Sequence, residues 1–391
     1  MSVVQTGLDR LASDDSDAVR VIRGRRVGLL AHAASVDREL RPARTVVTRA
    51  GGKLEAIFGP EHGFSGAAQD MVGVRGAEGE VIPTHSLYGE SENDLIPRPE
   101  WLEGLDAMVI DLQDVGSRYY TYVWTAALML KHAAAAGVTT VVLDRPNPLG
   151  GVRVEGAPQR DGFLSFVGLY PVAVRHALTI AELLQWVRVR EGLDRESLVV
   201  VPMRGWQRSM SWSQTGLPWV MPSPNMPTLD TAIVYPGGCL IEGTRLSEGR
   251  GTTRPFEVWG APRLDLAPLL ALETPGARVR PLEFTPTFQK HAGQTCSGVQ
   301  VHVTDSWVFR PYETYLRMLA AALIRVEPTD RWRTEEYEFV SDRPAIDLLT
   351  GGTEFRTALD AGDSVDDVVA AETAGAARFD EERRACWLYE K

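Results

Sequence analysis

The sequence predicts an α/β protein, a Rossmann-like layered parallel sheet followed by a smaller α+β C-terminal domain. Short runs rich in β-branched residues alternate with longer helical segments through the first half of the chain. Runs such as VVLD and AMVID are apolar on both faces, as expected of strands covered by helices on each side. The length of 391 residues, at about 150 residues per domain, favours two domains.

The first part of the chain is expected to form the catalytic domain. Residues 1–20 are polar and acidic, so we expect a flexible lead-in, with the Rossmann-like domain over residues 21–235. Its expected strands are Val27–Leu30, Leu54–Phe58, Ala107–Leu112, Thr139–Leu143, Leu198–Val201 and Ala232–Tyr235. Its expected helices are Arg44–Arg49, Thr121–Ala136 and Ile180–Arg190.

The second domain, expected over residues 236–391, closes the cleft. It follows a stretch, residues 205–262, that is rich in Pro, Gly and Trp and lacks a clear period, which is typical of a functional or connecting segment. Residues 298–305 alternate valine with polar neighbours and predict a half-buried strand. Helices are expected over residues 311–326 and 364–379.

Composition excludes several classes of function. The net charge of −11 argues against a general binder of nucleic acid or anionic membranes, which needs a basic surface. Three scattered cysteines give neither a disulfide framework nor a zinc-binding spacing. The N-terminus has no signal-peptide pattern and no apolar run reaches about 20 residues, so we expect a cytoplasmic protein without a membrane partner.

Candidate functional residues follow three successive strands. Because the carboxyl ends of parallel strands meet at one edge of a sheet, these loops are expected to form a polar pocket. The first loop carries Glu61 and His62, and the second carries Asp111, Asp114, Arg118, Tyr119, Tyr120 and Tyr122. The third carries Asp144, Arg145 and Asn147, with Glu155 shortly after it.

Structural roles are alternatives for several of these residues. Asp114 is also placed to cap the helix that begins near Tyr119, and Arg145 to pair with its neighbour Asp144. His62 is equally compatible with a histidine that only bonds its own loop. On a helix, Tyr119 and Tyr122 share a face and Tyr120 points elsewhere, so at least one tyrosine is expected in the core.

Familiar catalytic motifs are absent from the sequence. It contains no GxGxxG or GxxxxGK[ST] phosphate cradle, and neither GxSxG nor HExxH. We therefore expect no cofactor and no metal. Carboxylates, aromatic rings, amides and guanidinium groups together suit a sugar, since carboxylates transfer protons and aromatic faces stack on pyranose rings.

Several long motifs resemble one bacterial family, the exo-β-N-acetylmuramidases called NamZ-like, from about Arg26 to the C-terminus. The motifs are FGPEHGFSGAAQD, SLYG, DLQDVGSRYYTY, LDRPNPLGG with VEG, HALTIAELL, PSPNMPTLDTAIVYPG, EGTRLSEGRGTTRPFEVWGAP and FQKHAGQTCSGVQVHVTD. The resemblance implies a glycoside hydrolase that releases N-acetylmuramic acid from the non-reducing end of peptidoglycan fragments in cell-wall turnover and recycling. It also implies an active site near the domain junction, with the glutamate of PEHG, Glu61, in catalysis.

The remaining roles are hypotheses built on these motifs. A second acid is expected from Asp114, Glu155 or Asp111, with Asp114 favoured because Asp111 is expected to bond the loop backbone. Arg118, Arg145 or Arg250 would meet the lactyl carboxylate of the sugar, because a guanidinium binds a carboxylate with two parallel hydrogen bonds. Asn147 and Tyr122 are candidates for hydroxyl and acetamido contacts, and His62, Asp111, Tyr119, Asp144 and Asn225 complete the expected binding set.

Other functions remain open at this point. The chain is alternatively a non-catalytic sugar- or wall-fragment-binding protein, a hydrolase of a different amino sugar, or a nucleotide-sugar or dinucleotide enzyme on a Rossmann-like sheet. The expected partner is a small saccharide derived from muropeptides, and the sequence is silent on the oligomeric state. Many relatives carry an export signal that this sequence lacks, so a cytoplasmic enzyme would act on imported wall fragments.

Overall fold

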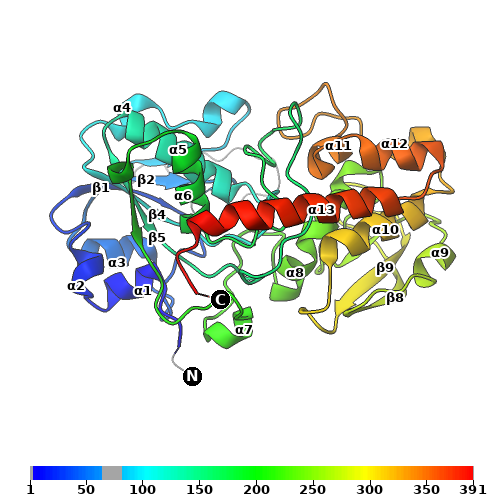
Figure 1. Ribbon diagram of the computed structural model, residues 1–391, viewed down its shortest axis with the longest axis horizontal. Helices are drawn as coiled ribbons and strands as arrows, with labels where there is room; N and C mark the ends of the chain where they lie inside the picture. The colour runs from blue at the N-terminus through cyan, green and yellow to red at the C-terminus, as the bar shows by residue number, and fades with distance from the viewer. Residues whose placement is uncertain (1–2, 64–81, 391) are drawn as a thin grey trace.

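The computed structural model describes residues 3–63 and 82–390. Figure 1 shows two halves side by side, a helix-covered sheet from the first part of the chain and a smaller domain from the second. The long helix α13 (Asp366–Arg383) runs across both halves.

A parallel sheet forms the core of the first half. Its strand order is β3-β2-β1-β4-β5-β6, and every pairing is parallel. The strands are β1 (Arg26–Ala31), β2 (Lys53–Gly59), β3 (Thr84–Ser86), β4 (Ala107–Asp111), β5 (Thr139–Leu143) and β6 (Leu198–Val201). The predicted α/β class is confirmed, and five of the six expected strands are found close to their predicted bounds.

Both faces of this sheet are buried, as the two-sided apolar runs predicted. Met108 and Ile110 of β4 pack in the core that contains α5 (Tyr122–Ala135) and α6 (Ile180–Arg190). Ala107 and Val109 point to the opposite face, into a second core with the N-terminal helices and α3 (Ala43–Arg49). The alternation of side chains along a strand therefore divides β4 between two helical layers.

The expected flexible lead-in is wrong, because residues 7–19 form two ordered helices, α1 (Gly7–Ala12) and α2 (Ser16–Val19). Thr6 and Asp9 make a capping box at the start of α1, which satisfies backbone N–H groups that the first turn leaves free. Leu8 and Leu11 are fully buried in the second core. The acidic composition of residues 1–20 led to the expectation of a flexible segment, although the few apolar residues of α1 have helical spacing.

The expected strand Ala232–Tyr235 is also wrong, because it lies inside helix α8 (Leu229–Gly238). Thr228 caps this helix by accepting a hydrogen bond from the Thr231 N–H. A Cβ on Gly237 would lie 2.2 Å from the Pro311 carbonyl oxygen, so glycine permits close packing against α10 (Pro311–Leu323). A four-residue apolar run does not distinguish a buried strand from a buried helix.

The second half contains an antiparallel sheet of order β7-β9-β8 with helices packed beside it. Its strands are β7 (Val258–Ala261), β8 (Ala277–Phe284) and β9 (Cys296–Val303), the last matching the expected half-buried strand. Its helices are α9 (Ala267–Leu270), α10 (Pro311–Leu323), α11 (Ala345–Thr350), α12 (Glu354–Ala361) and α13. Two short helices, α4 (Pro99–Leu102) and α7 (Trp212–Thr215), belong to the connections of the first half.

The last residues return to the first domain. The Trp387 ring packs against two guanidinium groups, with its centroid 4.3 Å from Arg208 Cζ and 5.2 Å from Arg383 Cζ. The Tyr389 hydroxyl donates to Asp144 Oδ2 over 2.6 Å, at the end of β5. The C-terminal segment is thus bonded to the carboxyl edge of the parallel sheet.

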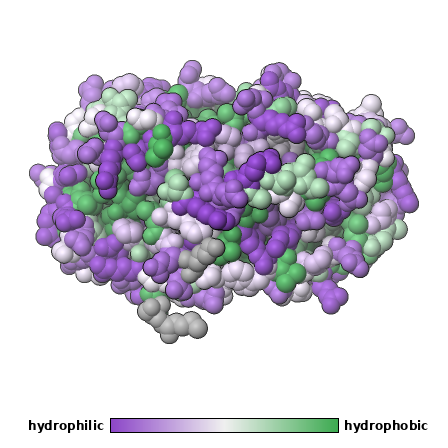
Figure 2. Space-filling view, in the orientation of Figure 1, coloured by the Kyte–Doolittle hydropathy of each residue, from purple (hydrophilic) through white to green (hydrophobic). Residues whose placement is uncertain are grey.

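The surface is polar, in keeping with the net charge of −11. Figure 2 shows hydrophilic residues over most of the visible face, with smaller apolar patches between them. Within residues 3–63 and 82–390, no helix has the length and apolar character required to cross a membrane.

Candidate active site

Glu61 lies in a tight turn directly after β2. The Gly63 N–H donates to the Pro60 carbonyl oxygen over 2.9 Å, and His62 adopts a left-handed backbone with φ of 68°. Such a conformation is uncommon outside glycine and is held here by the turn. Glu61 is only 6% exposed, so the turn holds its carboxyl group inside the protein.

The Glu61 carboxylate is fixed by a residue from the next strand-end loop. Thr121 Oγ1 donates a hydrogen bond of 2.7 Å to Glu61 Oε2. The other oxygen, Oε1, lies 3.8 Å from His62 Nε2. The loops after β2 and β4 therefore meet at Glu61, as the shared sheet edge predicted.

A small pocket surrounds this carboxylate and is lined from both halves of the molecule. Its volume is about 40 Å³, and it is partly open to solvent. The lining residues are Glu61, His62, Tyr119, Tyr120, Thr121, Tyr122, Val167, Ser223, Asn225, Met226, Tyr235, Glu242, Arg250, Phe256, Tyr337 and Glu338. Carboxylates, aromatic rings, an amide and a guanidinium group thus meet in one place.

On the second-domain side, a buried ion pair forms part of the lining. Arg250 Nη2 donates to Glu242 Oε1 over 2.7 Å, and the Tyr337 hydroxyl donates to Glu242 Oε2 over 2.8 Å. Burial opposes ionisation of Glu242, but Arg250 and Tyr337 outweigh it and lower the pKa of this carboxyl. Glu242 is therefore an anion with both oxygens occupied.

All three tyrosines of the RYYTY motif line the pocket, which differs from the helical expectation. The helix begins only at Tyr122, so Tyr119 and Tyr120 precede it and are free of helical spacing. The Tyr122 hydroxyl donates to the Pro222 carbonyl oxygen over 2.8 Å. Tyr122 thereby anchors the segment that brings Ser223 and Asn225 to the pocket.

Asp111 and Arg145 form a buried ion pair outside this lining. Arg145 donates to both Asp111 oxygens, through Nε over 2.6 Å and through Nη2 over 2.8 Å. Burial raises the pKa of Asp111, and the charge of Arg145 opposes this effect. Asp111 thus bonds Arg145 instead of the loop backbone, and Arg145 pairs with Asp111 and not with Asp144.

Three more predicted residues hold loops together. Asp114 Oδ2 accepts a hydrogen bond from the Gly116 N–H and lies 3.3 Å from His176 Nε2. Arg118 is fully buried and donates to the carbonyl oxygens of Ala157, Val172 and Leu349. Asn147 Nδ2 donates to the Leu178 carbonyl oxygen, and its Oδ1 accepts from the Leu149 N–H.

Asp144 and Glu155 also lie apart from Glu61. Asp144 accepts hydrogen bonds from the Ala181 N–H and the Tyr389 hydroxyl. Burial raises the pKa of Asp144 to about 7, against the opposing effect of these hydrogen bonds. The Ala181 N–H and the Tyr389 hydroxyl therefore bind Asp144 at the carboxyl end of β5.

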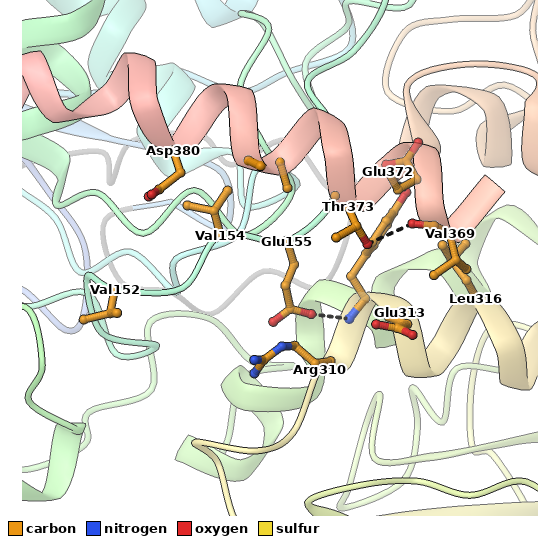
Figure 3. Close-up of a pocket in the computed structure, with 14 residues that line it drawn as sticks. Val152, Val154, Glu155, Arg310, Glu313, Leu316, Val369, Glu372, Thr373 and Asp380 are labelled. Carbon is orange, nitrogen blue, oxygen red and sulfur yellow. Dashed lines mark hydrogen bonds between the residues drawn. The ribbon is translucent and has the colours of Figure 1, made fainter. Parts of the chain in front are cut away.

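Glu155 lines a different and larger cavity of about 290 Å³ beneath α13 (Figure 3). It pairs with Arg175 over 2.9 Å and accepts the Tyr312 N–H over 3.2 Å. Glu372, on the opposite wall, accepts from the Ala157 N–H and the Tyr312 hydroxyl. The carboxylates on these two walls therefore fasten the two halves together.

The structure brings only part of the predicted set together. Those that line the Glu61 pocket are Glu61, His62, Tyr119, Tyr122, Asn225 and Arg250. Those that lie outside its lining are Asp111, Asp114, Arg118, Asp144, Arg145, Asn147 and Glu155. Sequence reasoning missed Thr121, Ser223, Glu242 and Glu338, of which the first three stand inside quoted motifs and Glu338 carries no sequence signal.

In the part of the chain that the structure describes, no three His, Cys, Asp or Glu side chains are grouped as a metal site. Residues 64–70 of the motif that begins with PEHG lie outside the described residues.

Comparisons with known proteins cover almost the whole chain. Residues 27–230 match the model of the N-terminal domain of exo-β-N-acetylmuramidase NamZ, and residues 233–389 match that of its C-terminal domain. The peptidoglycan β-N-acetylmuramidase NamZ of Bacillus subtilis strain 168 is 39% identical over 393 residues, covering 99% of this chain and 91% of the relative.

Two solved structures share the fold. Both are DUF1343 family proteins from Bacteroides fragilis NCTC 9343. The first is 29% identical with a TM-score of 0.86 and covers 99% of each chain. The second is 25% identical with a TM-score of 0.73 and covers 100% of each chain.

Proposed function

Because the chain belongs to the NamZ family of exo-β-N-acetylmuramidases, we propose that it releases N-acetylmuramic acid from the non-reducing end of β-1,4-linked peptidoglycan fragments. The observation that carries this proposal is the Glu61 carboxyl group, buried in a pocket of acids, aromatic rings and amides and oriented by Thr121. A glycosidase needs these groups, because cleavage requires a carboxylic acid positioned beside the sugar.

Glu61 is the proposed general acid. Cleavage of a glycosidic bond requires a proton on the departing oxygen, and a buried carboxylic acid supplies it. Since Thr121 occupies Oε2, the oxygen that carries the transferred proton is Oε1, on the His62 side. His62 Nε2 lies 3.8 Å from Oε1, beyond hydrogen-bond distance.

Arg250 is the proposed partner of the lactyl carboxylate. Arg118 and Arg145 are committed to backbone carbonyl groups and to Asp111, so they do not reach this pocket. Among the described lining residues, Arg250 is the one Arg or Lys side chain. Glu242 accepts from Nη2 over 2.7 Å and Glu248 Oε1 lies 3.5 Å from Nε, so two buried carboxylates fix the plane of the guanidinium group.

Ser223 and Asn225 are the proposed contacts for the hydroxyl and acetamido groups. They replace Asn147 in this role, because both amide atoms of Asn147 already bond the backbone.

Incubation with a MurNAc–GlcNAc disaccharide and with a chromogenic muramide, followed by mass spectrometry, tests the proposed activity. Release of N-acetylmuramic acid without added metal or nucleotide is the expected result. Binding of the disaccharide without any product would favour the non-catalytic alternative. Release of N-acetylglucosamine alone would favour a hydrolase of a different amino sugar.

The role of Arg250 has a separate test. Arg250→Lys keeps the charge beside Glu242 but loses the planar fork, so KM should rise about tenfold or more for the muramide. The matching glucosaminide lacks the lactyl group, and its KM should change little. Arg254→Lys, at an exposed neighbour in the same segment, is the matched control. An equal effect on both sugars would remove Arg250 from lactyl recognition.

A further inference from the structure

A buried histidine, His32, lies at the edge of the parallel sheet where ligands bind in folds of this kind. Strands β1 to β3 follow one another toward one side of the sheet and β4 to β6 toward the other, so the order changes direction between β1 and β4. Ligands of such sheets usually bind outside the carboxyl ends of the two strands at this point. His32 directly follows β1 and is only 2% exposed. The loop after β1 thus adds a buried polar group to the sheet edge that carries Glu61.

His32 connects the loop after β4 to a distant segment of the chain. The Gln113 backbone N–H donates to His32 Nε2 over 2.9 Å. On the other side of the ring, His32 Nδ1 lies 3.2 Å from the Pro222 carbonyl oxygen. Because a backbone N–H only donates and a carbonyl oxygen only accepts, Nε2 is the acceptor and Nδ1 carries the proton. One imidazole ring therefore bridges Gln113 and Pro222.

This bridge requires a neutral imidazole. Burial lowers the pKa of His32 to about 3, and the positive charge of Arg145 acts in the same direction. A proton on Nε2 would face the Gln113 N–H and break that hydrogen bond. At neutral pH the ring thus has one tautomer with both nitrogens bonded, which leaves neither nitrogen for proton transfer to a substrate.

The Pro222 carbonyl oxygen is held by two side chains of the first domain. The Tyr122 hydroxyl, at the start of α5, donates to it over 2.8 Å, and His32 Nδ1 is the second donor. The two rings meet edge to face, with their centroids 4.9 Å apart. Since a carbonyl oxygen has two lone pairs, His32 and Tyr122 together use its full capacity and fix its position.

The residues that follow Pro222 line the Glu61 pocket. They are Ser223, Asn225 and Met226. The Met226 N–H donates to the Ser223 carbonyl oxygen over 3.0 Å, so residues 223–226 form a tight turn. The position of Pro222 at the start of this turn therefore determines where Ser223 and Asn225 stand in the pocket.

From these contacts we infer that His32 is a positioning residue for saccharide binding, acting through Pro222 to hold Ser223 and Asn225 against the hydroxyl and acetamido groups of the sugar. The inference rests on the proposed function and deepens it. His32 is not among the residues that line the Glu61 pocket, so its effect on the sugar passes through the backbone. Glu61 keeps its own contact with Thr121, which is independent of this bridge.

Two substitutions of His32 separate positioning from stability. His32→Phe keeps a ring but removes both hydrogen bonds, so KM for a chromogenic muramide should rise about tenfold or more while kcat changes less than about threefold. His32→Asn places an amide nitrogen near the position of Nδ1, which keeps the bond to Pro222 and loses only the one to Gln113. Its KM should stay within about threefold of the unaltered protein. Both variants should lose a few degrees of melting temperature, because each leaves the Gln113 N–H unpaired.

His176→Phe is the matched control. His176 is also fully buried, and its Nδ1 accepts the Leu178 N–H over 3.2 Å, but it lies outside the lining of the Glu61 pocket. This variant should lose stability in the same way and keep its KM, measured per folded molecule. His32→Ala, which removes both bonds without added bulk, should repeat the rise in KM and replaces His32→Phe if that protein does not fold.

Titration calorimetry with N-acetylmuramic acid measures the effect without turnover, and His32→Phe should bind the sugar about tenfold more weakly. An unchanged KM in the folded His32→Phe protein, a fall in kcat at constant KM, or an equal rise in KM for His32→Asn or His176→Phe would each overturn the inference. Failure of the unaltered protein to release N-acetylmuramic acid would instead refute the proposed function, and the titration would still decide the role of His32.

Discussion

The Thr121 hydroxyl donates a 2.7 Å hydrogen bond to Glu61 Oε2, joining the loops that follow strands β2 and β4. Both residues are more than nine-tenths buried. The contact fixes one oxygen of the carboxylate, and in the proposed mechanism the other oxygen transfers the proton.

Replacing Glu61 by glutamine should abolish most activity without unfolding the protein. The glutamine carbonyl still accepts the Thr121 hydrogen bond, so the melting temperature should change little, whereas the amide has no acidic proton to give. Positioned proton transfer is worth about 10²–10⁴-fold, and kcat should fall by at least about 10². Turnover and melting temperature of Glu61→Gln, with the exposed Glu103→Gln as control, decide the point. A stable variant with near-full turnover would exclude Glu61 as the acid.

Glu155→Gln should behave in the opposite way. It leaves Arg175 as a buried charge without its carboxylate, a change that costs about 3–5 kcal/mol when one partner of a buried pair is removed. Turnover per folded molecule should remain, because Glu155 lies in a separate cavity. Urea unfolding and activity corrected for the folded fraction measure the two effects. Loss of turnover at full stability would return Glu155 to the catalytic candidates.

The ion pair of Asp111 and Arg145 should be essential for the first domain. Arg145→Ala leaves a fully buried carboxylate without a cation, so the free energy of unfolding should fall by about 3–5 kcal/mol. The double variant Asp111→Asn with Arg145→Ala removes both charges and should recover part of this loss. Denaturant titrations of the single and double variants test this, and additive losses would show that the two side chains do not interact.

Stability should decrease as the pH rises through the titration of Asp144. Its pKa is about 7 in the folded state because burial dominates, against about 3.9 in an unfolded chain. Between these values only the folded state holds the proton, so each pH unit lowers the free energy of unfolding, by up to about 4 kcal/mol in all. Asp144→Asn should flatten the profile between pH 4 and 7. Parallel profiles for both proteins, measured by urea unfolding, would contradict this assignment.

Sequence patterns predicted the elements whose signal is local. The apolar runs around Met108 and Val141 are buried on both faces, and this pattern predicted the bounds of strands β4 and β5 closely. The N-terminal helix was missed because its stability depends on a capping box and on Leu8 and Leu11 packing against a sheet that is distant in sequence. Local composition carries no information on such packing.

The candidate site was predicted only where it lies on one sheet edge. Glu61 was predicted because the loops after parallel strands meet at one edge of the sheet. The same rule also selected Asp111 and Arg145, whose charges neutralise each other in an ion pair. Glu338 and Glu242 arrive from the other domain, through a turn and a short helical segment without any strand-end signal. Which acids meet depends on how the two domains pack, and no periodicity in the sequence encodes that arrangement.

The bond between Tyr389 and Asp144 sets an order for biosynthesis. The strands of the parallel sheet leave the ribosome long before the C-terminal segment. Asp144 and Arg208 therefore remain without their C-terminal contacts while the second domain is synthesised. Trp387 packs against Arg208 and Arg383 only after the last residues have emerged. We therefore expect the parallel-sheet half, when expressed alone, to lack the cover that the C-terminal segment gives this edge.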